Sequence, residues 1–138
     1  MKNFFSLLLI LMAFSVNAQS DSLAVKSPKI VCKIKYGKTV GFGDYTIKFA
    51  EVISDSRCPK KVSCVWAGEA KVRLEIQKNT EPVENKNVLF DIQGKSTPLF
   101  DMENISVKTY RLEPYPEKLP IQDKTEYVLN LILVGKDS

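Results

Sequence analysis

The chain has 138 residues, of which 20 are Lys or Arg and 16 are Asp or Glu, so its net charge is +4. Apolar residues make up 44% and charged residues 26%, which is typical of one small globular domain and excludes a disordered or fibrous chain. Because the chain contains no His, catalysis by a His base and metal binding by His are excluded. The basic residues do not cluster, so we expect no nucleic-acid partner.

Residues 1–18 have the features of a secretory signal peptide. Lys2 gives the segment a positive start, residues 4–16 are almost all apolar, and Val16 and Ala18 satisfy the small-residue rule for cleavage. The apolar run is shorter than the ~20 residues that a membrane-spanning helix needs. No Cys follows the expected cleavage site, so the anchoring signature of a bacterial lipoprotein is missing. We therefore expect an exported, soluble protein of the periplasm or the medium, with no membrane span and no lipid anchor.

The mature chain, which begins near Gln19, is predicted to start with a flexible arm over residues 19–28, since this stretch is polar and small. Residues 29–138 then form a single β domain, because apolar and polar residues alternate there with the period of two that is typical of strands. The alternating segments are 30–36, 45–49, 70–77, 88–92 and 105–112. The phase slips after Phe49, which predicts a β-bulge at residues 50–51, and it slips again within the last of these segments.

The final strand is predicted over residues 127–134, which are apolar on both faces apart from Asn130, as in a central strand covered on both sides. Residues 98–104 have room for at most one helical turn. The connecting segments are predicted to be turns or a hairpin over 37–43, a polar loop over 79–87, a turn over 94–98, and a rigid crossover at 114–116. Six to eight short strands with such turns predict an all-β fold, a single small antiparallel β-sandwich of Ig-like or barrel-like form.

The most distinctive segment is the loop over residues 54–69, between two predicted strands. It contains Cys58 and Cys64, and two close cysteines usually pair in the oxidising compartment outside the cytosol. Closing a loop of this length contributes about 2 kcal/mol in the chain-entropy model. We therefore predict a Cys58–Cys64 disulfide that staples the loop. Cys32 remains as a free thiol, which either packs as a small apolar side chain or serves as a resolving or partner-linking thiol.

The same loop carries the residues that we assign to a candidate binding surface, which are Arg57, Lys60, Lys61 and Trp66. The favoured interpretation of Trp66, the only Trp of the chain, is that it packs on the disulfide and plugs the end of the sandwich. The alternative is an exposed anchor for a partner. Arg57 either meets a partner or forms an ion pair with Asp55 or Glu69. Gly68 fits a tight turn or a bulge before the next strand.

Metal binding and catalysis are poorly supported by the residues of this loop. A zinc site would need Cys58, Cys64, Asp55 and Glu69, but its usual His ligands are absent and the spacing of the cysteines matches no zinc motif. A copper(I) site on the three cysteines and Met102 would lack the expected Met-rich run. An acid–base pair of Asp55 and Glu69 has no accompanying nucleophile motif. We expect no metal, no cofactor, no catalytic residue and no enzymatic activity.

The loop also carries a resemblance. The chain resembles small exported bacterial proteins of uncharacterised function that share a DSRCP-x5-C-x-WAG-x-A-x-V-like motif, and the resemblance extends over about residues 45–134. The matching positions are Asp55, Ser56, Arg57, Cys58, Pro59, Cys64, Trp66, Ala67, Gly68, Ala70 and Val72, with a weaker match at 112–116 and 127–129. Many of those proteins resemble lipoproteins, whereas this chain lacks the anchoring Cys. The resemblance implies a bacterial envelope setting and supports the local disulfide, but it implies no substrate.

These observations predict an exported, non-enzymatic module whose specific function the sequence leaves open. Its partner would be an envelope or extracellular protein, or a small ligand, bound through the 54–69 loop on a rigid scaffold. One alternative is a protein resembling protease inhibitors, in which a disulfide-braced loop is extended and exposed. Another is a metal or redox carrier that uses the cysteines.

Overall fold

The computed structural model describes residues 29–118 and 124–136, so the expected signal peptide (1–18) and arm (19–28) lie outside the described residues. The described part contains eight strands and a short 3-10 turn. In chain order these are β1 (Lys29–Lys35), β2 (Thr39–Phe42), β3 (Tyr45–Asp55), β4 (Ala70–Lys78), β5 (Glu84–Phe90), β6 (Pro98–Asp101), β7 (Ile105–Glu113), η2 (Lys124–Glu126) and β8 (Val128–Gly135).

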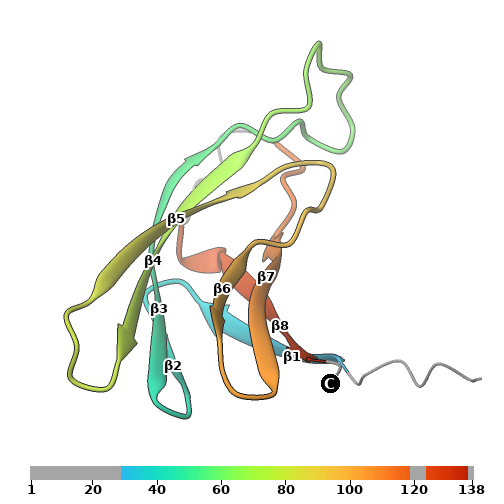
Figure 1. Ribbon diagram of the computed structural model, residues 1–138. Coiled ribbons are helices and arrows are strands. Elements are labelled where there is room, and N and C mark those ends of the chain that lie inside the picture. Colours follow the sequence, from blue (N-terminus) through green and yellow to red (C-terminus); the bar gives the residue numbers. More distant parts are fainter. Residues whose placement is uncertain (1–28, 119–123, 137–138) are drawn as a thin grey trace, which may run out of the picture.

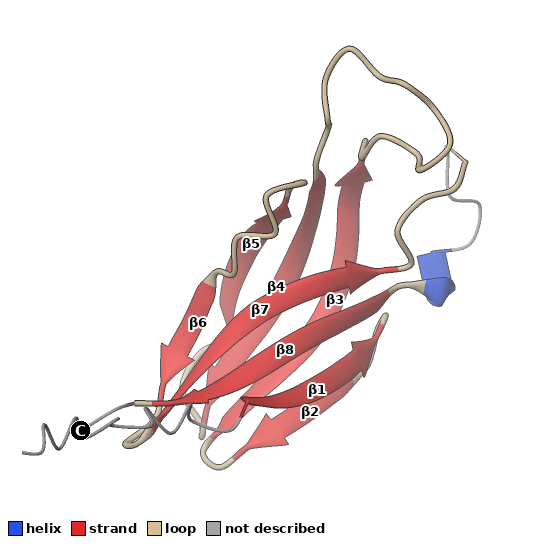
Figure 2. Cartoon of the chain, turned by 90° about the vertical axis from the view of Figure 1, so that its right-hand side faces the viewer, coloured by secondary structure: helices blue, strands red, loops and turns tan. Residues whose placement is uncertain are grey.

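The strands form two four-stranded antiparallel sheets that pack against each other (Figure 1, Figure 2). One sheet has the order β1-β8-β7-β6 and the other the order β2-β3-β4-β5. Both figures show the β3–β4 connection extending past the ends of the strands, at the top of the molecule. The prediction of a small all-β sandwich with one disulfide-stapled loop is confirmed.

The core lies between the sheets and follows from the alternation of apolar residues. Strand β4 is the clearest case, since every second side chain from Ala70 to Ile76 is buried while the intervening ones are polar. The largest side chain that is fully buried is Phe49, and its ring meets Tyr36 edge-on at a centroid distance of 5.7 Å. Each buried Leu, Ile, Val or Phe contributes roughly 1.5–3 kcal/mol relative to the exposed side chain.

The two predicted slips of phase are β-bulges in the structure. The β3–β4 register shifts between Phe49 and Glu51, and the β7–β8 register shifts between Thr109 and Arg111. Strand β8 lies between β1 and β7, and both Leu131 on the core side and its neighbour Ile132 are buried. The prediction of a central strand is confirmed, whereas its outer face is covered only in part, since Val128 and Val134 are partly exposed.

Three edge strands differ from the prediction. Strand β5 begins at Glu84, inside the predicted polar loop, and it ends at Phe90, so that Ile92 lies beyond it and is exposed. Strand β6 occupies the segment that had room for a helical turn, and β2 occupies part of the predicted turn region. These strands are short or largely polar because an edge strand buries few of its side chains, which leaves only a weak alternation to detect.

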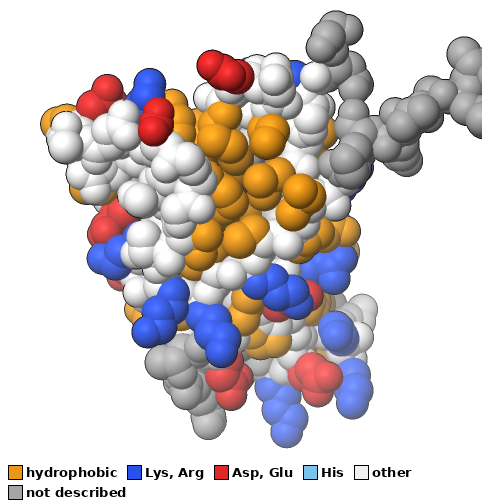
Figure 3. All heavy atoms as spheres, turned by 90° about the horizontal axis from the view of Figure 1, so that it is seen from below, with side chains coloured by type: hydrophobic (Ala, Val, Ile, Leu, Met, Phe, Trp, Pro, Cys, Tyr) orange, Lys and Arg blue, Asp and Glu red, His pale blue; other side chains and the backbone are white. Residues whose placement is uncertain are grey.

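The end of the sandwich opposite the β3–β4 connection is closed by aromatic side chains. Tyr45 stacks on Phe100 with a centroid distance of 4.1 Å, and Phe42 meets the same ring edge-on at 6.5 Å. Seen from this end, apolar side chains gather in a patch that has Lys and Arg side chains at its margin (Figure 3). The first residue of β1, Lys29, pairs with Val134 near the end of β8. The described chain ends therefore lie away from the β3–β4 connection.

Candidate functional site

The β3–β4 connection, residues 56–69, is called the disulfide loop below, and its base continues the ladder of the two strands. The backbone N–H of Ser56 donates to the carbonyl of Glu69 at 2.8 Å, and the N–H of Cys58 donates to the carbonyl of Ala67 at 2.8 Å. The hydroxyl of Ser56 also donates to the Glu69 carbonyl at 3.0 Å. The loop thus has a narrow neck that is held by hydrogen bonds between its two sides.

Gly68 makes this neck possible. Its φ of 68° lies in the left-handed region that favours glycine. A Cβ at this position would also overlap the carbonyl oxygen of Ser56 on the opposite side of the neck. The structure assigns neither a turn nor a bulge to Gly68 itself, but its positive φ and the close approach of the two strands explain why no side chain fits there.

The predicted Cys58–Cys64 disulfide is present, and the two Cα atoms lie 6.0 Å apart. A bond from the Val62 N–H to the Pro59 carbonyl, 3.2 Å long, closes a turn inside the ring. Cys32 is a free, half-buried thiol on β1, and burial raises its pKa. It belongs to the other sheet and packs against the core, so within the described residues it behaves as a small apolar side chain.

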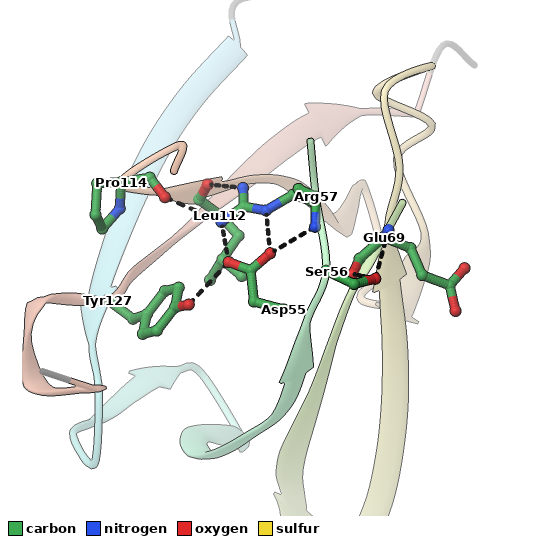
Figure 4. Close-up of polar contacts among 7 residues, drawn as sticks. All are labelled: Asp55, Ser56, Arg57, Glu69, Leu112, Pro114 and Tyr127. Carbon is green, nitrogen blue, oxygen red and sulfur yellow. Dashed lines mark hydrogen bonds and ion pairs between the residues drawn. The ribbon is translucent and has the colours of Figure 1, made fainter. Parts of the chain in front are cut away.

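Arg57, predicted as a contact residue, is buried, and this prediction is wrong. Only 4% of its side chain is exposed, and only 5% of the side chain of its partner Asp55. The guanidinium and the carboxylate form a two-pronged pair, in which Nε donates to Oδ1 at 2.9 Å and Nη2 donates to Oδ2 at 2.6 Å (Figure 4). Of the two carboxylates considered as partners, Asp55 is therefore the one that pairs.

The remaining donors of Arg57 reach the other sheet. Nη1 donates to the carbonyl of Leu112 at 2.9 Å, and Nη2 donates to the carbonyl of Pro114 at 3.0 Å (Figure 4). The guanidinium also lies 5.1 Å from the ring centre of Tyr115. Because Asp55 ends β3 and Leu112 lies in β7, a single side chain ties the two sheets together where the disulfide loop begins.

Tyr127 completes this group, named the Arg57 cluster below and made of Asp55, Arg57 and Tyr127. The Tyr127 hydroxyl donates to Asp55 Oδ2 at 2.8 Å. Burial by itself raises the pKa of the Asp55 carboxyl, but hydrogen bonds from Arg57 and Tyr127 and the charge of Arg57 outweigh it and hold that pKa below its usual range. Burial and the bond to Asp55 raise the pKa of the Tyr127 hydroxyl. Asp55 therefore remains an anion and Tyr127 remains a neutral donor.

The proposed acid–base pair is not assembled. Every strong contact of Asp55 goes to Arg57 and Tyr127, whereas the Glu69 side chain is exposed and points away from the cluster (Figure 4). Within the described residues no group of three or more His, Cys, Asp or Glu side chains is placed to hold a metal ion. Cys58 and Cys64 are bonded to each other, so they offer no thiolate to a metal.

Residues 60–66, called the loop tip below, are the most exposed part of the disulfide loop. The exposed fraction is 57% for Val62, 95% for Val65 and 76% for Trp66, and both Lys60 and Lys61 are exposed as well. The favoured interpretation of Trp66 as a plug on the disulfide is therefore wrong, and the alternative of an exposed side chain is correct. A Trp and two Val side chains that are all exposed on one short loop are unusual in a small domain.

An open groove of about 1210 Å³ runs beside the loop at the same end of the sandwich. Pro59, Lys60 and Val62 form one wall, and the residues after β5 and at the end of β7 form the others. The backbone N–H of Lys60 donates to the carbonyl of Pro116 at 3.2 Å, which holds the loop against the crossover after β7. Val65 and Trp66 do not line this groove.

The structure thus divides the predicted site residues into two groups. Lys60, Lys61 and Trp66 lie together at the loop tip, while Arg57 lies inside. Val62 and Val65 were missed by the sequence-based prediction, although two apolar residues in a loop rich in Lys and Ser were a detectable sign. Tyr127 was also missed, because nothing local in the sequence links it to Asp55.

Comparison of the chain with protein-family models, with curated proteins and with solved structures found no match. No helix in the described part of the chain is long and apolar enough to cross a membrane. The function is therefore inferred from the residues of the loop and their geometry.

Proposed function

We propose that this protein is an exported, non-enzymatic binding module that holds an envelope protein or a small ligand through the disulfide loop. The observation that carries the proposal is the exposure of Trp66, Val65 and Val62 on a loop whose base is fixed. Exposed apolar patches of this kind mark interaction sites, and Trp is the side chain most often found at the energetic centre of interfaces. A loop that is already cross-linked loses less entropy when it binds.

The contact residues of this proposal are Lys60, Lys61, Val62, Val65 and Trp66. Arg57 has a different role, since its buried pair with Asp55 and its bonds to β7 hold the loop base in place. The groove beside the loop, with Lys60 in its wall, gives a small ligand a place next to the same surface.

Export is supported by two features. The disulfide indicates a non-reducing environment. The signal-peptide pattern of residues 1–18 provides the route, and the resemblance to small exported bacterial proteins agrees with an envelope setting.

Photo-crosslinking tests the proposal. A benzophenone amino acid at Val65 should give a discrete adduct in the envelope of the host. The matched control is the same amino acid at Val83, which is also an exposed apolar residue but lies in the β4–β5 turn at the other end of the sandwich. Unlabelled wild-type protein should compete the adduct away, and W66A should not. The loop tip is not the binding surface if the benzophenone at Val65 gives only the adducts that it also gives at Val83. The same holds if unlabelled W66A competes with the labelled protein as well as the wild type does.

A protein resembling protease inhibitors is the second candidate, and the exposure of Val65 within a disulfide-braced loop favours it. In that case the loop would enter the cleft of a protease as an extended segment. Inhibition of envelope and secreted proteases that is lost in V65D would support this candidate, while full activity of all of them in the presence of the protein would exclude it.

A further inference from the structure

The loop tip combines exposed apolar side chains with charge of one sign. Residues 58–67 contain two lysines and no Asp or Glu, and the other residues of this segment are apolar or uncharged. The nearest acidic residue before them, Asp55, is neutralised by its buried pair with Arg57. The tip therefore presents Lys60 and Lys61 on the same short segment as Val65 and Trp66, and the first acidic residue after it, Glu69, is exposed at the loop base.

The tip is also the part of the described molecule that projects furthest from the sheets at this end (Figure 1, Figure 2). Val65 and Trp66 are 95% and 76% exposed and lie outside the groove, so the part of the tip that they form protrudes into solvent. A protruding apolar tip fits a protein only if that protein has a matching pocket. A lipid surface needs no such pocket, because its headgroup region accepts a side chain at any point.

The chemistry of the tip matches that of a bilayer surface. Trp is enriched at membrane interfaces, where its ring is half in the apolar phase and its N–H remains in contact with polar groups. Lysines next to such a side chain are attracted by anionic headgroups. The Cys58–Cys64 bridge and the neck at Gly68 hold the tip in shape, so that docking orders little additional chain.

We propose that the loop tip docks on a lipid bilayer with anionic headgroups. Trp66 and Val65 enter the headgroup region, and Lys60 and Lys61 contact the headgroups. The proposal rests on the proposed function in that it uses the same loop of an exported protein, and it adds a lipid surface to the targets of that loop. The opposite end of the sandwich then faces away from the contact and stays open to a protein or a small ligand.

Vesicle binding followed through Trp66 tests the proposal directly, since the full chain contains one Trp and it lies in the tip. The mature protein is mixed with vesicles of phosphatidylcholine alone or of phosphatidylcholine with phosphatidylglycerol. With the anionic vesicles we expect co-sedimentation, a blue shift of Trp66 emission, and quenching by lipids brominated near the headgroup. Unchanged emission and no co-sedimentation with the anionic vesicles would overturn the proposal.

Matched variants separate docking by the tip from general attraction of a basic protein. Neutralising two interfacial lysines with K60Q/K61Q should weaken partition into anionic vesicles about thirtyfold. The control K29Q/K136Q removes the same charge at the opposite end of the sandwich and should have little effect. Equal losses in the two double variants would overturn the proposal. W66A should also lose co-sedimentation while it keeps its fold.

The proposed function and this inference fail in different ways. If vesicles leave Trp66 unchanged but the Val65 crosslink to an envelope protein forms, the lipid proposal is wrong and the proposed function stands. If vesicles bind as described but no crosslink to a protein forms, the lipid surface is the target of the tip and the protein partner is excluded.

Discussion

Arg57 occupies a position that a neighbouring strand would otherwise fill. Strand β6 pairs with β7 only over Ser106–Lys108, so the rest of that edge of β7 has no strand beside it in the described part of the chain. The guanidinium of Arg57 donates to the carbonyls of Leu112 and Pro114 just past this point. A charged side chain at an open edge also discourages pairing with another chain. Arg57 therefore joins the two sheets and protects an edge at the same time.

Removal of Arg57 should destabilise the fold strongly. R57A leaves the buried Asp55 carboxylate without its cation and two carbonyls without a donor, which should lower the free energy of unfolding by about 3–5 kcal/mol. Urea unfolding measures the loss. The control is R73A, because the Arg73–Glu51 pair at 3.1 Å is nearly half exposed and should be worth less than about 1 kcal/mol. Losses of the same size in both variants would contradict the bracing role of Arg57.

The carboxyl of Asp55 should make stability depend on pH at the acid side. Its pKa is lowered in the folded protein, so its contribution is complete above the unfolded value of about 3.9 and is lost as the pH falls through the folded value. The difference in unfolding free energy between the wild type and D55N should therefore be constant near neutral pH and should shrink below about pH 4. A difference that stays constant to the lowest pH at which the protein folds would show that the carboxylate charge is not involved.

At the scale of elements, the neck of the disulfide loop depends on Gly68. Both Gly68 and Gly37 have a positive φ, but only at Gly68 would a Cβ overlap a backbone atom. G37A should therefore lower the free energy of unfolding only by the cost of the left-handed conformation, about 1–2 kcal/mol, whereas G68A should lower it clearly more. Thermal unfolding of the two variants compares them. Equal losses would mean that the close contact with Ser56 does not restrict this position.

The sequence predicted the strands in which buried and exposed residues alternate regularly, and it missed those in which they do not. Strands β3, β4, β7 and β8 were predictable because alternate side chains face one core. A slip of phase revealed one bulge in β3 and one in β7, but not the second register shift of β3 between Val52 and Ser54. The edge strand β1 was predicted, whereas β2, β5 and β6 were missed in whole or in part since few of their residues are buried. For β5 these are Val88 and Phe90, which did reveal its second half. The disulfide was predictable because its cysteines are close in the chain and the expected export implies an oxidising compartment.

The candidate site was predictable only in its location. Leu112, which accepts a hydrogen bond from Arg57, lies 55 residues further along the chain, and Tyr127, which donates to Asp55, lies 72 residues further along. No local sequence pattern joins residues at such separations. An Arg next to two Lys in a loop looks like part of one basic surface, yet the fold places Arg57 inside and the lysines outside. The exposure of Trp66 was equally open, because an apolar side chain beside a disulfide either covers the bridge or projects from it.

At the scale of the whole molecule, the two ends of the sandwich differ in kind. One end is closed by the stacked rings of Tyr45 and Phe100 and lies near Lys29, where the described chain begins. The other end carries the Arg57 cluster, the groove and the disulfide loop (Figure 1, Figure 4). The rigid sheets and the buried cluster supply stability, and the loop tip is left free to make contacts.

The division between the buried Arg57 cluster and the exposed loop tip is tested most directly by quenching of Trp66 fluorescence with acrylamide. The measurement compares the native mature protein, without vesicles or partner, with the same protein in urea. Because Trp66 is 76% exposed, native quenching should approach that of the unfolded chain, and W66A should change the free energy of unfolding by less than about 0.5 kcal/mol. A native Trp66 that acrylamide cannot reach, together with a W66A variant that unfolds, would place the ring in the core and contradict the loop tip as the working surface.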